Sequence, residues 1–345
     1  MRRVLFVDSQ SEVPYDERSP GDPACAIGGS EATLARIAAG LATDRHIDVV
    51  QMARTEHHHG GGVHWHPWSA LAELAARADA IVVQRHDALA PRLRRWSRTA
   101  RIVLWLHDSI DLAGAPSSTL RAELRALTYR MVGVTRVCVS PFHAENVRAA
   151  LDLGRMAPRL FRPDIRVICN PVIAHAPDPC PPLDRDKLVY CSAPTNRLPM
   201  ILDAFAAVRA AIPSMRLHLA CPAYDQFDPE ALPPDSGVVA MGPLPQTRLH
   251  AELADALCLF YPQSNVAEAF GLVFAEAHAL GTPALAHDFG AARDLLSPEE
   301  RIDARDIPAV VARIIAWRDG ARPAVARNPA FALETILDQW RGLLG

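Results

Sequence analysis

Short apolar runs alternate with longer helix-like segments along almost the whole chain of 345 residues. Apolar runs with few charges are typical of strands buried on both faces of a parallel sheet, and the segments between them suit the covering helices. The alternation is interrupted at residues 170–182, where five prolines among thirteen residues indicate a stiff linker. It then restarts, so the pattern predicts an α/β protein with two doubly wound domains.

The pattern divides the chain into two similar sets of elements. In the first half, strands are expected at residues 3–8, 46–52, 80–84, 101–106, 134–139 and 165–169, and helices at 29–43, 69–77, 118–131 and 142–151. In the second half, strands are expected at 187–192, 215–220, 237–241, 257–261 and 283–287, and helices at 198–211, 246–254, 271–280, 290–295 and 306–318. Apolar residues at helical spacing predict a last amphipathic helix at 330–344.

These elements predict the domain boundaries. We expect an N-terminal Rossmann-like domain at 1–172, a linker at 173–186, a C-terminal Rossmann-like domain at 187–325, and a C-terminal helix at 326–345 that packs back on the first domain. Doubly wound domains bind ligands at the carboxyl ends of their strands, so a ligand site is expected in the cleft between the domains.

Composition limits the possible partners and the compartment. Residues 1–170 carry 22 Arg and no Lys against 18 Asp and Glu, whereas residues 171–345 carry 13 Arg and one Lys against 21. The acidic second half argues against nucleic acid as a partner, and the mildly basic first half suits an anionic surface or acceptor. Seven dispersed cysteines without a C-x2-C pair indicate reduced thiols and a cytoplasmic protein. No apolar run is as long as a membrane span, and the first residues do not suit a signal peptide.

One segment of the second half places two glutamates around a glycine, with seven residues between them. Residues 272–280 are apolar and suit a helix, which the Gly-Thr-Pro sequence after them would end. Glu276 then lies inside the helix, whereas Glu268 and Phe270–Gly271 lie in the loop before it. Because the first N–H groups of a helix lack partners within it, such a loop suits a phosphate. Carboxylates on both sides could accept hydrogen bonds from sugar and ribose hydroxyls, and these three groups together make a nucleotide-sugar.

The full run from Glu268 to Ala284, E-A-F-G-L-V-F-A-E-A-H-A-L-G-T-P-A, resembles the E-x7-E signature of retaining glycosyltransferases with the GT-B fold. The resemblance is chiefly to glycosyltransferase family 4 (glycosyl transferases group 1), whose members usually read E-G-F-G-L-x-x-x-E-A-x-A-x-G-x-P-V. It implies that Glu268 holds the donor sugar and that Glu276 binds ribose hydroxyls. Three residues would bind the donor near its phosphates: Phe270, Gly271 and Leu272.

Glycines mark two further donor-site candidates. Gly28 and Gly29 precede a predicted helix, where they would let a ligand approach backbone N–H groups closely. Taken alone they suit a flexible loop with Ser30 as the helix cap, but family 4 proteins commonly carry a Gly-Gly loop here. In that family the turn at Gly242 meets the nucleotide base through its backbone, although a simple turn explains this glycine equally well.

A basic loop follows the first predicted strand of the second domain. Arg197 resembles the phosphate-binding lysine of family 4, and an arginine can grip a diphosphate with two parallel hydrogen bonds. Asn196, directly before it, is expected to bind the donor as well. The chain has one lysine in all, so an arginine in place of lysine is reasonable here. The alternative is a surface arginine near a helix start.

Polar residues end two predicted strands of the first domain. His107 and Asp108 follow the strand at 101–106, where family 4 proteins often have a histidine near donor and acceptor. His107 could donate a hydrogen bond to a sugar hydroxyl or polarise the acceptor, and Asp108 could orient it or bind the acceptor. Arg85 and His86 end the preceding strand and are weaker candidates for the acceptor site.

Two conspicuous stretches remain. Residues 57–66 contain five histidines, but three adjacent histidines cannot all face one ion, and no carboxylate or cysteine completes a metal site. We therefore expect a solvated surface hairpin and no metal. Residues 92–96 together with Arg98 and Arg101 form a basic patch with leucine and tryptophan, which suits either contact with anionic lipid or a solvated helix face.

These observations lead to a specific hypothesis. The chain would be a metal-independent hexosyltransferase that moves a hexose from a UDP- or GDP-sugar to a glycan or lipid-linked hydroxyl acceptor, with retention and without a cofactor, in cell-surface polysaccharide or glycolipid synthesis. His107, Arg197 and Glu268 would carry the chemistry, at a cytoplasmic location with possible membrane association. The alternatives are a nucleotide-sugar epimerase or hydrolase on the same fold, and a catalytically inactive nucleotide-sugar-binding protein.

Overall fold

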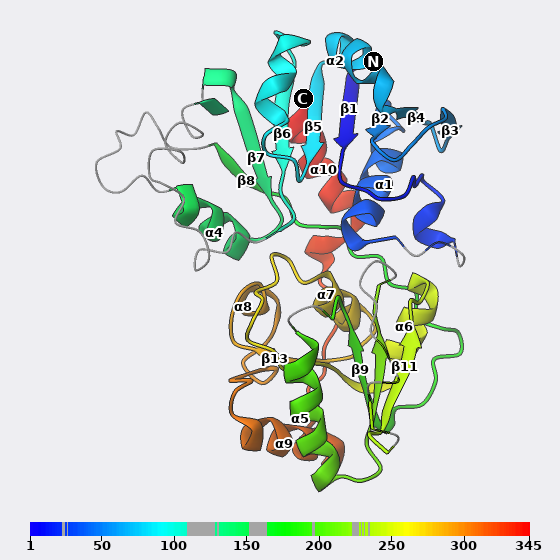
Figure 1. Cartoon of the computed structure of the whole chain (residues 1–345), viewed down its shortest axis with the longest axis vertical. Helices are drawn as coiled ribbons and strands as arrows, with labels where there is room; N and C mark the ends of the chain where they lie inside the picture. The colour runs from blue at the N-terminus through cyan, green and yellow to red at the C-terminus, as the bar shows by residue number, and fades with distance from the viewer. Residues whose placement is uncertain are drawn as a thin grey trace. The chain divides into compact units, whose positions relative to one another are not determined.

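The apolar runs form the strands of two sheets in the computed structural model, which describes residues 1–22, 25, 27–108, 128–129, 131–151, 164–194, 197–222, 228, 230, 232–233 and 235–345. The chain divides into two units. The first comprises Met1–Ser19, Gly29–Pro171 and Leu333–Gly345, and the second comprises Pro20–Gly28 and Val172–Ala332. In Figure 1 the last helix, drawn in red, accordingly lies with the blue and cyan elements of the first unit.

The first unit contains, within its described residues, an eight-stranded sheet in the order β3-β4-β2-β1-β5-β6-β7-β8. Neighbouring strands pair in parallel except β3 and β4, which are antiparallel. The strands are β1 (Arg3–Asp8), β2 (His46–Gln51), β3 (His58–Gly60), β4 (Val63–Pro67), β5 (Ala80–Gln84), β6 (Arg101–Trp105), β7 (Val134–Cys138) and β8 (Ile165–Val167). The helices are α1 (Gly29–Leu41), α2 (Leu71–Arg77), α4 (Pro141–Leu151) and α10 (Leu333–Leu344). Most of the helix predicted at 118–131 lies outside the described residues.

Helices on both faces explain why the strands of this sheet are apolar throughout. In β1, Leu5 and Val7 join a buried cluster that includes the apolar side of α2. The side chain between them, Phe6, meets Trp340 of α10 edge to face, with ring centroids 6.4 Å apart. The same indole packs on Trp105 at the end of β6, at 4.8 Å, and so fixes α10 to the sheet.

The second unit has a six-stranded, parallel sheet in the order β11-β10-β9-β12-β13-β14 within its described residues. The strands are β9 (Asp184–Cys191), β10 (Arg216–Ala220), β11 (Val238–Gly242), β12 (Ala256–Tyr261), β13 (Ala284–His287) and β14 (Arg301–Ile302). The helices are α5 (Leu198–Ala211), α6 (Gln246–Ala254), α7 (Leu272–Ala279), α8 (Ala292–Leu295) and α9 (Ile307–Ala316). One buried apolar cluster runs through both faces of this sheet.

The predicted surface hairpin at 57–66 is only partly right. β3 and β4 do form a hairpin, and β3 is the edge strand. However, β4 also pairs in parallel with β2, and its Val63 and Trp65 are fully buried. Alternation therefore puts this strand's apolar side chains in the core and its histidines on the other face.

Candidate functional site

The sheet order of the second unit identifies where a ligand can enter. From β9 the chain moves outward through β10 to β11, then returns to the other side of β9 and moves outward through β12 to β14. The carboxyl ends of β9 and β12 therefore flank the point where the direction reverses, which is where doubly wound sheets bind ligands. Ser192 follows β9, and Tyr261 ends β12.

Four side chains meet at this switch point. Arg197, at the N-terminus of α5, lies with its Nη2 3.3 Å from Oε1 of Glu268, so the structure brings these two predicted residues together. The Tyr261 hydroxyl lies 2.5 Å from the same oxygen and 3.1 Å from Oγ of Ser192. Nη1 of Arg197 lies 3.4 Å from that Ser192 oxygen. The cluster thus combines one carboxylate, one guanidinium and two hydroxyls.

Burial makes Tyr261 a lasting hydrogen-bond donor. Its ring stacks on Tyr190, with centroids 5.5 Å apart, and meets Phe274 of α7 edge to face at 5.2 Å. Desolvation, reinforced by the negative charge of Glu268, raises the pKa of Tyr261 well above its usual value, although Arg197 opposes this. The phenol therefore remains protonated and orients the carboxylate.

The loop before α7 has the conformation that the sequence predicts. Gly271 caps the helix with a left-handed backbone (φ 77°), and a Cβ there would lie 2.5 Å from the ring of Phe274. Only glycine fits such a position without strain. Leu272 is the first helical residue, where backbone N–H groups lack partners within the helix. The Phe270 side chain is buried and meets Phe331 edge to face at 5.3 Å, so this residue can offer a ligand only its backbone.

Glu276 lies inside α7, as predicted, and is a buried carboxylate. Nε2 of Gln246, in the first turn of α6, donates to its Oε1 at 2.7 Å. His250 accepts the backbone N–H of His175 at Nδ1, so its Nε2 carries the proton and points toward the same Oε1 at 3.9 Å. That Nε2 is fully buried and has no hydrogen-bond partner among the residues that the structure describes.

Gly242 ends β11 in a left-handed turn (φ 66°), and no atom of the described part of the chain lies within 4 Å of a Cβ placed there. The turn therefore explains this glycine without close approach of another group.

Asn196 lies outside the described residues. Sequence reasoning missed Tyr261, Gln246 and His250. Of these three, only Tyr261 could have been identified from the sequence, because it lies at the carboxyl end of a buried apolar run.

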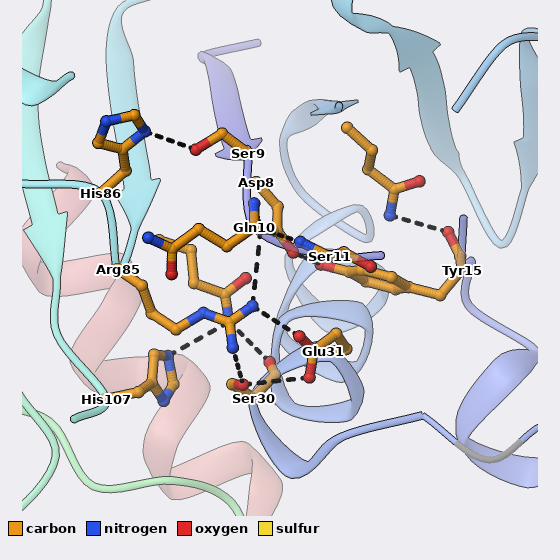
Figure 2. Close-up of polar contacts among 12 residues, drawn as sticks. Asp8, Ser9, Gln10, Ser11, Tyr15, Ser30, Glu31, Arg85, His86 and His107 are labelled. Atoms are coloured by element: carbon orange, nitrogen blue, oxygen red, sulfur yellow. Dashed lines mark hydrogen bonds and ion pairs between the residues drawn. The ribbon is translucent and has the colours of Figure 1, made fainter. Parts of the chain in front are cut away.

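The first unit has its own switch point, between β1 and β5. Figure 2 shows the polar residues gathered there, from the carboxyl ends of β1, β5 and β6 and from the start of α1. Arg85, directly after β5, has a left-handed backbone (φ 59°), which is unusual for a residue with a side chain. Its N–H donates to the carbonyl of Trp105 at 2.8 Å. Such strain persists only where surrounding contacts hold it, and it is concentrated at functional sites.

The guanidinium of Arg85 is the centre of this network (Figure 2). It lies 2.6 Å from Oε1 of Glu31 and 3.7 Å from Oδ1 of the fully buried Asp8, and it donates to Oγ of Ser30 at 3.0 Å. Burial disfavours its charge, but the two carboxylates outweigh that effect and hold the pKa of Arg85 above its usual value. Ser30 is therefore an inner helical residue bound to arginine rather than the expected helix cap, since α1 begins at Gly29.

His107 lies beside this network and is neutral. Desolvation, with the nearby positive charges of Arg85 and His143, lowers the pKa of His107 well below its usual value. Gln84 Nε2 lies 3.4 Å from its Nε2 and can only donate, so the ring proton of His107 lies on Nδ1. The ring can therefore donate one hydrogen bond to a hydroxyl.

Two further predicted residues have defined places. His86 Nδ1 lies 2.6 Å from Oγ of Ser9 after β1, so this histidine faces the same edge of the sheet. Asp108 is exposed, and its carbonyl accepts a 3.0 Å hydrogen bond from Nε2 of the buried His143. Gly28 lies directly before α1 and Gly29 is its first residue.

The basic patch is less accessible than the sequence predicts. Leu93 is fully buried, and Arg94 donates to the carbonyls of Val132 and Ala100 at 2.8 and 2.6 Å. Arg92 and Arg98 remain exposed. None of the helices in the described ranges is both long enough and apolar enough to cross a membrane.

The expectation that no carboxylate completes the histidine run is wrong. Oδ2 of Asp16 and Oε1 of Glu17 lie 3.6 and 3.5 Å from Nε2 of His58, because the loop after β1 returns to the hairpin. These three side chains could hold a metal ion. The glycine that follows the histidines makes room for the contact, since a Cβ on Gly60 would collide with the carboxylate of Glu17.

Two doubly wound units, each with polar residues at its switch point, define a protein of the GT-B fold, as the resemblance implied. The chain is similar over its whole length to solved structures of this fold. Sucrose-phosphate synthase from Thermosynechococcus elongatus is 16% identical, with a TM-score of 0.64 over 99% of this chain and 98% of that one. The Anabaena protein HepE, in complex with UDP, is 16% identical, with a TM-score of 0.64 over 100% and 99%. A glycosyltransferase from Rickettsia africae is 11% identical, with a TM-score of 0.64 over 99% and 97%.

The family match lies in the second unit. Residues 193–322 match the family described as Glycosyl transferases group 1. The match includes both glutamates and Arg197, so the family predicted from the Glu268–Ala284 run is confirmed. No curated protein matches the sequence.

Proposed function

We propose that the chain is a glycosyltransferase that moves a hexose from a UDP- or GDP-sugar to a hydroxyl acceptor with retention of configuration. The family match supports group transfer. Two similar structures of Anabaena HepE are complexes, one with UDP and the other with UDP and glucose. These likenesses favour a nucleotide-sugar donor for this chain, with UDP as the first candidate.

One observation carries the proposal. Each of the two glutamates is held through one carboxylate oxygen, Oε1, and its second oxygen, Oε2, has no hydrogen-bond partner among the described residues. Tyr261 and Arg197 contact Oε1 of Glu268, and Gln246 contacts Oε1 of Glu276. Each Oε2 can therefore accept hydrogen bonds from ligand hydroxyls. A sugar hydroxyl at Glu268 and ribose hydroxyls at Glu276 would leave the diphosphate beside the N-terminus of α7.

The proposed chemistry depends on charge at the diphosphate. Arg197 and the N–H groups of Gly271 and Leu272, which have no partner within α7, would stabilise the negative charge that develops as the bond between the sugar and the diphosphate breaks. Retention would follow if the acceptor attacks the face that the diphosphate leaves, with the leaving phosphate taking the acceptor proton. Glu268 then positions the sugar and does not need to act as a nucleophile.

We assign acceptor binding to the polar edge of the first unit. The neutral His107 would donate from Nδ1 to a hydroxyl, and Arg85, His86 and Asp108 would line the acceptor position. Glycan and lipid-linked hydroxyls suit this edge, which fits a role in cell-surface polysaccharide or glycolipid synthesis. The exposed Arg92 and Arg98 would provide any contact with an anionic membrane.

A thermal-shift screen tests the proposal. UDP-, GDP- and ADP-sugars are added singly to the full chain, and a bound ligand raises the melting temperature by mass action. We expect one base to stand out and nucleotide release to require an acceptor. Release of nucleotide without acceptor, or an altered sugar, would indicate a hydrolase or epimerase instead. Binding without turnover across a panel of acceptors would indicate an inactive nucleotide-sugar-binding protein.

A further inference from the structure

Five histidines share one face of the sheet edge formed by β2, β3 and β4, apart from the site described above. In the β3–β4 register His59 lies opposite His64. His57 directly precedes β3, and its side chain contacts that of His66 on β4. The His59 and His64 rings stack with centroids 4.3 Å apart, and the His57 and His66 rings lie 5.1 Å apart. On β2, His46 stacks on His64 at 4.9 Å. We call these five residues the histidine face.

One pair in this face lies close enough for both imidazoles to reach a single ion. Nδ1 of His57 lies 3.0 Å from Nδ1 of His66. Nε2 of His66 lies 2.7 Å from Oδ1 of the buried Asp48, and a carboxylate can only accept, so the His66 proton lies on Nε2. The lone pair of His66 Nδ1 therefore points toward His57. A carboxylate that fixes the far nitrogen of an imidazole is the usual partner of a metal-bound histidine.

We propose that the histidine face binds a divalent transition-metal ion of the zinc type, with Nδ1 of His57 and Nδ1 of His66 as its first two ligands. In tetrahedral zinc sites with Zn–N bonds of about 2.0–2.1 Å, two ligand nitrogens lie about 3.3 Å apart. To bind one ion the two nitrogens separate by about 0.3 Å, and both rings turn so that their lone pairs converge on it. His57 places its proton on Nε2 when the ion binds, so no proton has to be released.

Neighbouring imidazoles can complete the coordination. His59 is exposed on the edge strand and His64 is half-buried beside it, so either ring can turn toward the ion. Imidazole ligands select zinc, copper or nickel over magnesium and calcium. Asp48 is also 3.2 Å from Nε2 of His46, which orients its carboxylate across the face. The ion would join the residue before β3 to β4 and so hold the open end of the edge hairpin together.

His58 supplies an internal control, because its side chain lies on the opposite face of β3. It contacts Asp16 and Glu17 there and takes no part in the His57–His66 pair. The variant His58→Gln removes an imidazole from the same run of three without touching the proposed ligands. It also disrupts the Asp16–Glu17–His58 group, which could hold an ion itself.

Calorimetric titration of zinc chloride into the tag-free full-length chain, kept reduced, tests the proposal. We expect one tight site in the native chain and in His58→Gln. His57→Gln and His66→Gln should each weaken that site at least tenfold, and Asp48→Asn should weaken it about 10–100-fold through loss of the oriented ring. Unchanged circular dichroism would show that the variants are folded. Equal binding by native and His66→Gln chains, or loss of binding in His58→Gln alone, would overturn the proposal.

Cobalt as a probe adds a spectrum that would not change if Asp48 only supported the fold. Cobalt bound by imidazoles should give visible d–d bands in the native chain, and Asp48→Asn should shift those bands and move the onset of binding to a different pH. A thiolate charge-transfer band in the near ultraviolet would instead place the ion at a cysteine and overturn the assignment.

Discussion

Replacing Arg85 tests whether its left-handed backbone is strained and whether the ion pairs of its side chain maintain that conformation. Arg85→Ala removes the guanidinium from Glu31 and Asp8, and breaking a buried ion pair costs about 3–5 kcal/mol. The lower end applies here, because Asp8 keeps hydrogen bonds from the Tyr15 hydroxyl (2.8 Å) and the Gln10 N–H (2.9 Å). We expect Arg85→Ala to lose about 3 kcal/mol of unfolding free energy.

Arg85→Gly loses the same ion pair but relieves the backbone. Alanine at φ 59° retains a steric cost of about 1–2 kcal/mol, whereas glycine adopts this conformation freely and loses somewhat more chain entropy on folding. The glycine variant should therefore be about 1 kcal/mol more stable than the alanine variant. This reverses the order expected at an ordinary position.

Urea unfolding followed by tryptophan fluorescence measures the difference. Trp65, Trp105 and Trp340 are fully buried in the first unit and report its unfolding. A glycine variant less stable than the alanine variant would refute the strain argument. Loss of less than about 1 kcal/mol in both variants would show that the ion pair is not a significant support.

Three further changes follow from the same reasoning. Tyr261→Phe removes the donor that orients Glu268 and should weaken donor binding about tenfold in calorimetry, with kcat/KM falling in parallel and the fold unchanged. Gly271→Ala forces a Cβ toward the ring of Phe274 at a left-handed position, so it should lower the unfolding free energy by about 2 kcal/mol or more in urea titrations. Burial lowers the pKa of His143 to about 4, so the unfolded chain binds this proton first. Unfolding free energy should thus fall by up to about 3 kcal/mol as the pH decreases from about 6.5 to 4, and His143→Gln should remove that part of the pH dependence.

The strands, and the helices between them, were predictable because strands buried in a parallel sheet are continuous apolar runs. The strand at 80–84 and the helix at 246–254 were placed with their observed bounds, and the helix at 271–280 within one residue. The loop around Gly271 was predictable for a related reason, since a glycine before an apolar helix implies both a turn and free N–H groups.

Contacts between distant parts of the chain were not predictable from local pattern. Arg85 and Glu31 are 54 residues apart, and their pairing depends on a positive φ that nothing in the residue type indicates. Tyr261 reaches Glu268 only because β12 ends beside β9 at the switch point. For the same reason the carboxylates near His58 were missed, since they lie about 40 residues earlier in the sequence, in the loop after β1.

The donor affinity of Glu276→Gln tests the central claim most directly. The substitution keeps the size of the side chain and replaces a carboxylate oxygen that should accept ribose hydroxyls, where each hydrogen bond to a charged group is worth about 1.5–3 kcal/mol. Calorimetry with the nucleotide selected by the thermal-shift screen should show binding at least tenfold weaker than in the native chain. The exposed Glu334→Gln variant should bind as the native chain does. Unchanged affinity in folded Glu276→Gln would contradict the assignment of this site to the nucleotide-sugar.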